Sequence, residues 1–222
     1  MAPYLRSLTI FGICAAAVSL APRDARAIAI GVLDDYQNGT VSEWFGGTTI
    51  TNLPGGPLGP ADLFLNVRSN GNGGGNGSKV SSHNSELRWT GDYLAAGVSA
   101  IQADMRNLGA TTLNMRMVLF GSGSRWTSTM GVSLAPNSGW QHLTFPVSQA
   151  SLTRVLGNTT YDGTLMNVNQ IMFRHDGGNP SSGGEAINGT LGMDNITAVP
   201  APGLASLAGV CGLALLGRRR TR

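Results

Sequence analysis

The sequence predicts an all-β protein in which two antiparallel sheets pack face to face as a sandwich of jelly-roll type. Three observations support this prediction. The chain contains 32 glycines in 222 residues, no long segment has the 3.6-residue period of a helix, and several segments alternate apolar with polar residues. Such alternation is typical of antiparallel strands that are half buried, and clusters of glycine, asparagine and serine separate the segments as turns do.

Four segments alternate clearly. In one of them, Ile171 and Phe173 oppose Gln170 and Arg174. The four segments are residues 98–108, 111–120, 140–147 and 168–175. Weaker candidates are residues 29–34, 63–67, 85–89, 127–134 and 191–198. About nine strands in one domain favour a two-sheet sandwich. We also expect one short helix, at residues 148–156.

The N-terminus has the pattern of a secretory signal peptide at residues 1–27. A short start with one arginine precedes an apolar stretch, residues 8–21. The small residues Ala25 and Ala27 then predict cleavage before Ile28. The alternative is an N-terminal helix that stays attached as a membrane anchor.

The C-terminus, residues 199–222, has the pattern of a sorting signal. Pro200 and Pro202 precede an apolar run, residues 203–217, and a cationic cluster follows it. The run of 15 residues would form a helix of about 22 Å. It is shorter than the roughly 20 residues that a comfortable bilayer span needs. We therefore expect a hydrophobic helix that enters a membrane, and a β-sandwich domain at residues 28–198. The cluster includes Arg218, Arg219 and Arg220.

These terminal patterns resemble the bacterial PEP-CTERM proteins, which combine a signal peptide, an exported domain, a Pro-x-Pro motif, an apolar helix and an arginine cluster. The resemblance implies processing by an exosortase-type membrane enzyme and delivery to the cell envelope, often together with exopolysaccharide. One position departs from the family pattern, because Ala201 stands where the family usually has glutamate. A simple C-terminal membrane anchor is the alternative.

Charge and cysteine content exclude several classes. Residues 28–202 contain one lysine and seven arginines against eight aspartates and three glutamates, a net charge of about −3. The basic balance of the whole chain comes from its ends, so there is no argument for nucleic-acid binding. Cys14 and Cys211 both lie in the apolar terminal segments. The domain therefore has neither a disulfide framework nor a thiolate metal site.

Three short stretches resemble jelly-roll carbohydrate-binding modules: residues 34–39 (DDYQNG) with Trp44 ahead, residues 138–145 (SGWQHLTF) and residues 193–196 (MDNI). In those modules, acidic residues on the neighbouring first and last strands hold one structural calcium ion. The resemblance implies a calcium site at Asp34, Asp35 and Asp194, to which Gln37 adds an oxygen. The alternative is that these aspartates only shape a turn and cap a strand partner. Oxygen donors of this kind suit calcium.

Sugar binding needs flat aromatic faces and hydrogen-bonding side chains. Trp89, before a polar turn, and Trp126, after a glycine-rich turn, are the candidates for surface rings, although each also suits a core. Trp140 is expected in the core or at its rim. The carbohydrate-binding candidates are Trp89, Tyr93, Trp126, Arg125 and Arg174.

No catalytic motif is present in the sequence, and His83, His142 and His175 are widely separated. We therefore expect a non-enzymatic protein of the cell envelope or extracellular matrix that binds exopolysaccharide. Two alternatives stay open. The first is a purely structural surface protein without a small ligand, and the second is a polysaccharide hydrolase or lyase. The glycine- and asparagine-rich stretch at residues 69–78 is expected to be a flexible loop.

Overall fold

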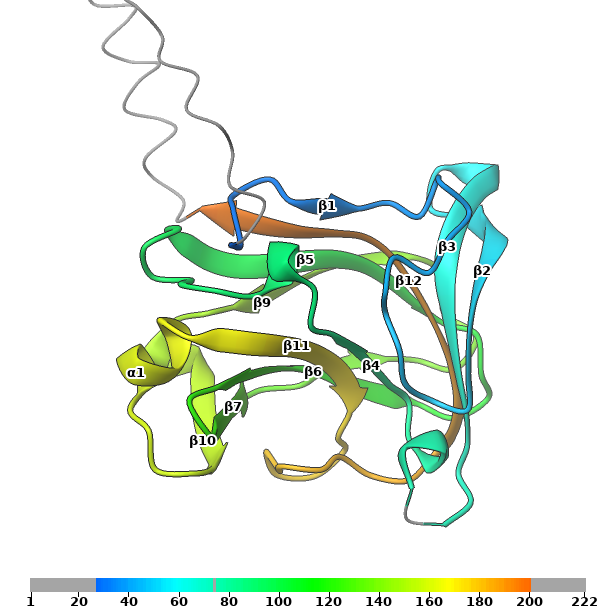
Figure 1. Cartoon of the computed structure of the whole chain (residues 1–222). Coiled ribbons are helices and arrows are strands. Elements are labelled where there is room, and N and C mark those ends of the chain that lie inside the picture. Colours follow the sequence, from blue (N-terminus) through cyan, green and yellow to red (C-terminus); the bar gives the residue numbers. More distant parts are fainter. Residues whose placement is uncertain (1–26, 74, 201–222) are drawn as a thin grey trace, which may run out of the picture.

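Two antiparallel sheets face each other across one hydrophobic core (Figure 1). This computed structural model describes residues 27–73 and 75–200. Sheet A contains β2 (Thr49–Gly56), β3 (Gly59–Asn70), β12 (Asn188–Pro200), β5 (Val98–Asn107) and β9 (Gln141–Pro146), in this spatial order, and β1 (Leu33–Asp34) also pairs with β12. Sheet B contains β10 (Leu152–Leu156), β7 (Ser124–Ser128), β6 (Leu113–Gly121), β11 (Val168–His175) and β4 (Ser81–Asn84), and β8 (Val132–Leu134) also pairs with β6.

The predicted all-β sandwich is confirmed, because little helix accompanies the two sheets. The helical elements of the described chain are α1 (Tyr161–Leu165) and the short 3-10 turns η1 (Asn76–Ser78), η2 (Leu87–Trp89) and η3 (Gln149–Ser151). The predicted signal helix and C-terminal helix lie outside the described residues. Within residues 27–73 and 75–200, no helix has the length and hydropathy needed to cross a membrane.

The core forms where the alternating strands turn their apolar faces inward. On β5, Ile101 and Met105 are fully buried, and on β6 Met115 and Leu119 are fully buried. All four belong to one cluster of buried side chains between the sheets. Burial of each such side chain contributes about 1.5–3 kcal/mol. The period-two pattern of the sequence therefore corresponds to the inner faces of the two sheets.

Residues 85–89 do not form the predicted strand. The Asn84 side chain accepts a hydrogen bond from the Glu86 amide at 2.8 Å, and the Trp89 amide bonds back to the Glu86 carbonyl at 2.9 Å. This closes the turn η2, in line with the tendency of asparagine to bond its own neighbouring backbone. The alternation of these residues was too short to distinguish a turn from a strand.

Two further predictions need correction. Most of the helix expected at residues 148–156 is strand β10, in which the β-branched Thr153 and Val155 suit an extended backbone. The single strand expected at residues 127–134 is divided between β7 and β8, which pair with different parts of β6. Strands β2 and β4 had not been predicted.

Strand β12 forms the spine of sheet A, because it pairs with β1, β3 and β5. It extends through Pro200, which lies opposite Val98, and so passes the predicted domain boundary at residue 198 by two residues. The connection from β11 to β12, residues 176–187, lies against the outer face of sheet B (Figure 1). That face and the outer face of sheet A carry the two groups of functional candidates.

Candidate functional site

The outer face of sheet B holds a pocket of about 240 Å³. The pairing of neighbouring strands places the side chains that line the pocket next to one another. His83 of β4 lies opposite Met172 of β11, and Phe120 of β6 lies between Gln170 of β11 and Arg125 of β7. These five side chains line the pocket together with Ser81, Lys79, Ser182 and Gly183. The pocket therefore combines a sheet floor with one wall from the connection between β11 and β12.

An exposed aromatic ring adjoins the pocket. Phe45 is 50% exposed and stacks on the His83 ring, with the ring centroids 5.2 Å apart and an angle of 15° between the planes. The backbones of the two residues exchange hydrogen bonds of 3.0 and 2.8 Å. The backbone at Gly46 passes so close to β4 that only glycine fits, because a Cβ built there would lie 2.4 Å from the Ser81 carbonyl oxygen. Phe45 thus offers a flat apolar face to solvent beside hydrogen-bonding groups.

The pocket is cationic. Arg125 lies over the Phe120 ring, with its guanidinium carbon 4.7 Å from the ring centroid. Burial lowers the pKa of His83, the Gln170 side chain opposes this shift, and the charges of Arg125 and Arg174 lower the pKa further. His83 Nδ1 is buried and has no hydrogen-bond partner among the described residues. At neutral pH we therefore expect His83 to be an uncharged polar group of this face.

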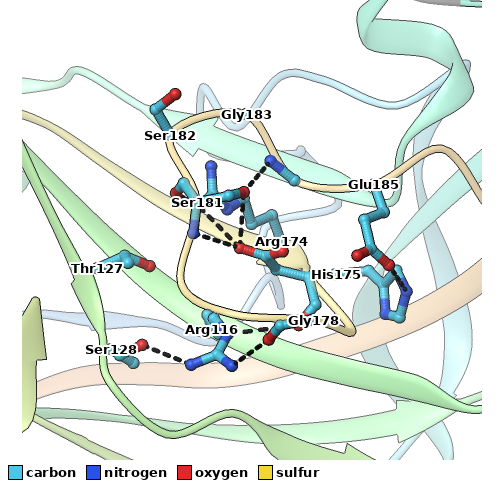
Figure 2. A network of polar contacts seen from close by, with 12 residues as sticks. Arg116, Thr127, Ser128, Arg174, His175, Gly178, Ser181, Ser182, Gly183 and Glu185 are labelled. Carbon is cyan, nitrogen blue, oxygen red and sulfur yellow. Dashed lines mark hydrogen bonds and ion pairs between the residues drawn. The ribbon is translucent and has the colours of Figure 1, made fainter. Parts of the chain in front are cut away.

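A buried polar network holds the wall of the pocket in place (Figure 2). The Arg174 guanidinium pairs with the Asp176 carboxylate at 3.1 Å, and both side chains are 1% exposed. The same carboxylate accepts hydrogen bonds from the amide and hydroxyl of Ser181, at 3.0 and 2.9 Å. Arg116 donates to the Gly178 carbonyl at 2.8 Å and to the Ser128 carbonyl at 2.7 Å. These bonds tie residues 176–184 to strands β6, β7 and β11.

The aromatic carbohydrate-binding candidates Trp89, Tyr93 and Trp126 do not lie at the surface, so the core alternative is the correct one for both tryptophans. Trp89 and Tyr93 are fully buried, and Trp126 is only 9% exposed because it packs on Tyr161. All three belong to the core between the sheets, where a sugar cannot reach the ring faces. Trp44 is buried as well. Short polar turns next to an aromatic residue do not reveal on which side of the chain the ring lies.

The two predicted arginines lie on the outer face of sheet B, but only Arg125 lines the pocket. Arg174 is covered by residues 181–184 and holds them in place. Phe45 was missed, although it directly follows Trp44 in the sequence. Of two adjacent aromatic residues in an irregular segment, the sequence does not specify which one enters the core.

The outer face of sheet A carries a group of aspartates around Asp194. A bulge in β12 puts Asn195 at a φ of 49°, and its side chain donates to Asp104 at 2.8 Å. Asp194 is fully buried, and its Oδ2 has no hydrogen-bond partner among the described residues. Burial raises the pKa of Asp194 to about 7, and the charges of Asp62, Asp104 and Asp35 contribute to the increase.

Asp34 does not belong to this group. Its Oδ2 accepts hydrogen bonds from the indole nitrogens of Trp44 at 2.7 Å and Trp89 at 2.8 Å. Its Oδ1 lies 2.7 Å from Arg88 Nη1. Burial raises the pKa of Asp34, and these three partners oppose the increase. The carboxylate of Asp34 points into the core, where it accepts hydrogen bonds from the two indoles. The Asp34-Asp35 pair in the sequence does not reveal this direction.

The carboxylate that lies beside Asp194 is that of Asp62, whereas the sequence had suggested Asp34 for this position. A Cβ built on Gly56 would lie 2.4 Å from Asp62 Oδ2 and 3.2 Å from Asp194 Oδ2, so these two carboxylates face the same small space. Gln37 adjoins it, because its side-chain amide donates to Asp62 Oδ1 at 2.7 Å and to the Asp35 and Leu63 carbonyls. Oxygen atoms of this kind fit calcium. Among the described residues, no three acidic, histidine or cysteine side chains converge closely enough to hold a metal by themselves.

Of the predicted processing residues, only two lie within the described part of the chain. Ala27 is exposed and its Cβ lies 3.1 Å from a Cβ built on Gly91. Pro200 is the last residue of β12. The other predicted residues, Ala25, Pro202, Arg218, Arg219 and Arg220, lie outside the described residues.

Comparison with known proteins finds similarity in structure alone. No protein-family model matches the chain, and no curated protein matches it. A family 11 carbohydrate-binding module from Clostridium thermocellum, solved in complex with a β-1,3-1,4-mixed-linked tetrasaccharide, matches with a TM-score of 0.52 at 19% identity, over 79% of this chain and 98% of that one. An exo-β-agarase matches with a TM-score of 0.53 at 12% identity, over 78% of this chain and 25% of the agarase chain. At these identities the likeness shows the fold, a sandwich like that of the family 11 module.

Proposed function

We propose that the protein is a non-enzymatic polysaccharide-binding protein that holds its ligand on the outer face of sheet B. The observation that carries this proposal is the exposed Phe45 ring, stacked on His83 beside a polar pocket. A pyranose ring has apolar C–H faces and hydroxyl edges, so it suits an aromatic face next to hydrogen-bonding groups. The side chains of Gln170 and Ser81 and the backbone of residues 182–183 supply such groups.

The likeness to a carbohydrate-binding module supports the proposal at the level of the fold. The match spans nearly the whole length of the family 11 module named above, which was solved with a bound tetrasaccharide. Sandwiches of this kind expose a broad sheet face between loops, and a chain-like ligand can lie along such a face. The agarases are similar only over about a quarter of their length, so they favour a shared domain and lend no support to catalysis.

The test is the substitution Phe45→Ala, assayed by affinity electrophoresis of the full chain in a mild non-ionic detergent, with neutral and acidic polysaccharides in the gel. Loss of one stacked aromatic face should weaken binding about tenfold. The matched control is Leu58→Ala, because Leu58 is an exposed apolar residue in the β2–β3 turn, 85% exposed and outside the pocket. We expect that variant to bind like the unaltered protein.

If the Phe45→Ala and Leu58→Ala variants bind equally strongly, the ligand binds elsewhere on the protein. This result would contradict the proposed site. If no polysaccharide retards the unaltered protein, the purely structural surface protein becomes the better explanation. That second candidate has an observation in its favour, since Trp44, Trp89 and Trp126 serve the core.

We propose further that the domain is exported to the bacterial envelope or extracellular matrix. The terminal sequence patterns support this part of the proposal. In this scheme an exosortase-type enzyme processes the C-terminal signal, and the C-terminal helix holds the chain in the membrane at least transiently. A polysaccharide-binding domain would then meet its ligand at the cell surface.

A structural calcium ion forms the last part of the proposal. Asp194 and Asp62 would hold it, together with oxygen atoms of Gln37 and Asp35 after reorientation of the Gln37 amide. The ion would neutralise two facing carboxylates and join β12 to the β2–β3 hairpin. It replaces the set inferred from the sequence, because Asp34 is committed to Trp44, Trp89 and Arg88.

A further inference from the structure

Positive charge is concentrated behind and within the pocket of sheet B. Lys79 and Arg125 line the pocket, and Arg116 and Arg174 lie beside it on the same face of the sheet. These four account for half of the eight lysine and arginine residues in residues 28–202, a segment whose net charge is about −3. The local charge therefore has the opposite sign to that of the domain.

Strand register places two of these cations against each other. Arg116 of β6 and Arg174 of β11 are direct cross-strand partners, an arrangement that destabilises a sheet unless other groups compensate for it. Burial lowers the pKa of Arg174, Asp176 opposes this, and the charges of Arg125 and Arg116 lower the pKa further. Among the described residues, the one carboxylate paired with this cluster is that of Asp176. Glu185 instead faces His175 at 3.8 Å.

Backbone carbonyls provide most of the remaining compensation, and for Arg116 these are the carbonyls of Ser128 and Gly178 (Figure 2). Lys79 donates to the Gly183 carbonyl at 2.8 Å, Arg125 to the Ser182 carbonyl at 3.0 Å, and Arg174 to the Ser181 carbonyl. A carbonyl oxygen carries only a partial charge, so four cations and one carboxylate leave a net positive field. Arg174 Nε and Nη1 are also buried, without hydrogen-bond partners among the described residues.

We infer that the pocket recognises an acidic polysaccharide and places the anionic substituent of a sugar, a uronate carboxylate or a sulfate ester, between Arg125 and Lys79. The inference rests on the proposed function and specifies its ligand class. Of the described residues that line the pocket, none carries a carboxylate that would repel such a group. Phe45 would then stack on one sugar while the two cations bind the charge of another.

The experiment measures the affinity of the full chain, in mild non-ionic detergent, for four polymers in low and high salt. Polygalacturonate supplies carboxylates and κ-carrageenan supplies sulfate esters. Carboxyl-reduced polygalacturonate is the neutral match, and mixed-linkage β-glucan is a second neutral polymer. We expect at least one acidic polymer to bind about tenfold or more tightly than the neutral match. The preference should weaken as salt screens the charges.

Matched variants locate the effect. Arg125→Gln and Lys79→Gln should each remove most of the preference for the acidic polymer. Arg154→Gln is the control, because Arg154 also donates to backbone carbonyls, at Asn158 and Thr159, but lies outside the pocket. It removes the same charge and should leave the preference intact. Thermal melting of each variant verifies that the fold is retained, and Arg125→Lys, which keeps the charge, should retain the preference.

Equal affinity for polygalacturonate and its reduced form, with κ-carrageenan no tighter, would overturn the inference and leave the proposed function standing if Phe45→Ala still weakens binding. An equal loss in Arg154→Gln would overturn it too, since a diffuse charge effect would explain the preference. Competition by inorganic sulfate or free galacturonate as strong as that by the polymer would show a small-anion site instead. Absence of binding to all four polymers would overturn both the inference and the proposed function.

Discussion

At the scale of single residues, Asp34 connects several parts of the core. Its carboxylate receives hydrogen bonds from two buried tryptophans and pairs with Arg88, which also donates to the Ser42 carbonyl at 3.0 Å. Trp44 stacks edge-on to Trp89, with centroids 6.0 Å apart, and packs on Phe173 of sheet B. One acidic side chain therefore fixes the orientation of two large rings that join the sheets.

We predict that Asp34→Ala lowers the free energy of unfolding by about 3 kcal/mol, because it leaves two buried indole N–H groups without acceptors. Urea unfolding followed by tryptophan fluorescence measures this change. Asp162→Ala is the control, since Asp162 is exposed, and it should cost under about 0.5 kcal/mol. A loss below about 1 kcal/mol in Asp34→Ala would show that the two indoles find other acceptors.

At the scale of elements, the connection between β11 and β12 is a wall held by side chains from three strands. The Asp176 carboxylate accepts three hydrogen bonds, one from Arg174 of β11 and two from the amide and hydroxyl of Ser181 in the connection itself. Without this carboxylate, the positive charges beneath the wall would repel one another with less compensation. The shape of the pocket thus depends on one buried ion pair.

We predict that Asp176→Ala destabilises the protein by about 3–5 kcal/mol, because a buried arginine loses its partner. Hydrogen exchange should accelerate at the amides of residues 177–184. Glu185→Ala is the control on the same connection, since the Glu185 side chain is 51% exposed, and its cost should stay below about 1 kcal/mol. Unchanged exchange at the Ser181 amide in Asp176→Ala would contradict this account of the wall.

At the scale of the whole molecule, the Asp194 group lies where β12 meets the β2–β3 hairpin. A cation there would cross-link the central strand of sheet A to its edge. Two facing carboxylates without a cation oppose folding, so the proposed ion would raise the stability of the entire domain.

We predict that calcium raises the melting temperature of the full chain by about 5–10 °C over a chelator, as about 2.7 kcal/mol of binding at saturation implies. Asp194→Asn should abolish this response and melt no lower than the unaltered protein in chelator, since the variant relieves the repulsion with Asp62. Asp162→Asn should retain the response. Identical melting of the unaltered protein with calcium and with chelator would remove the ion from the proposal.

The period-two patterns determined much of the fold in advance, because alternation reports directly which face of a strand is buried. Residues 168–175 form β11 as predicted, and residues 98–108 contain β5. Short or polar elements were not predictable, such as β4 (SSHN), whose residues are held by their partner β11 and carry little local preference. The turn at η2 likewise depends on one asparagine side chain.

The candidate sites show where the sequence alone reaches its limit. By itself, it determined the all-β class, the charge of the domain and the patterns at both ends. It also singled out Arg125 and Asp194, which the structure places in the two candidate sites. Only the tertiary structure decided that Phe45 is exposed and Trp44 buried, that Asp62 joins Asp194, and that four cations gather on one face. The physical reason is that alternation along a strand is local, whereas a site is formed by strand register and by irregular segments that bring distant residues together.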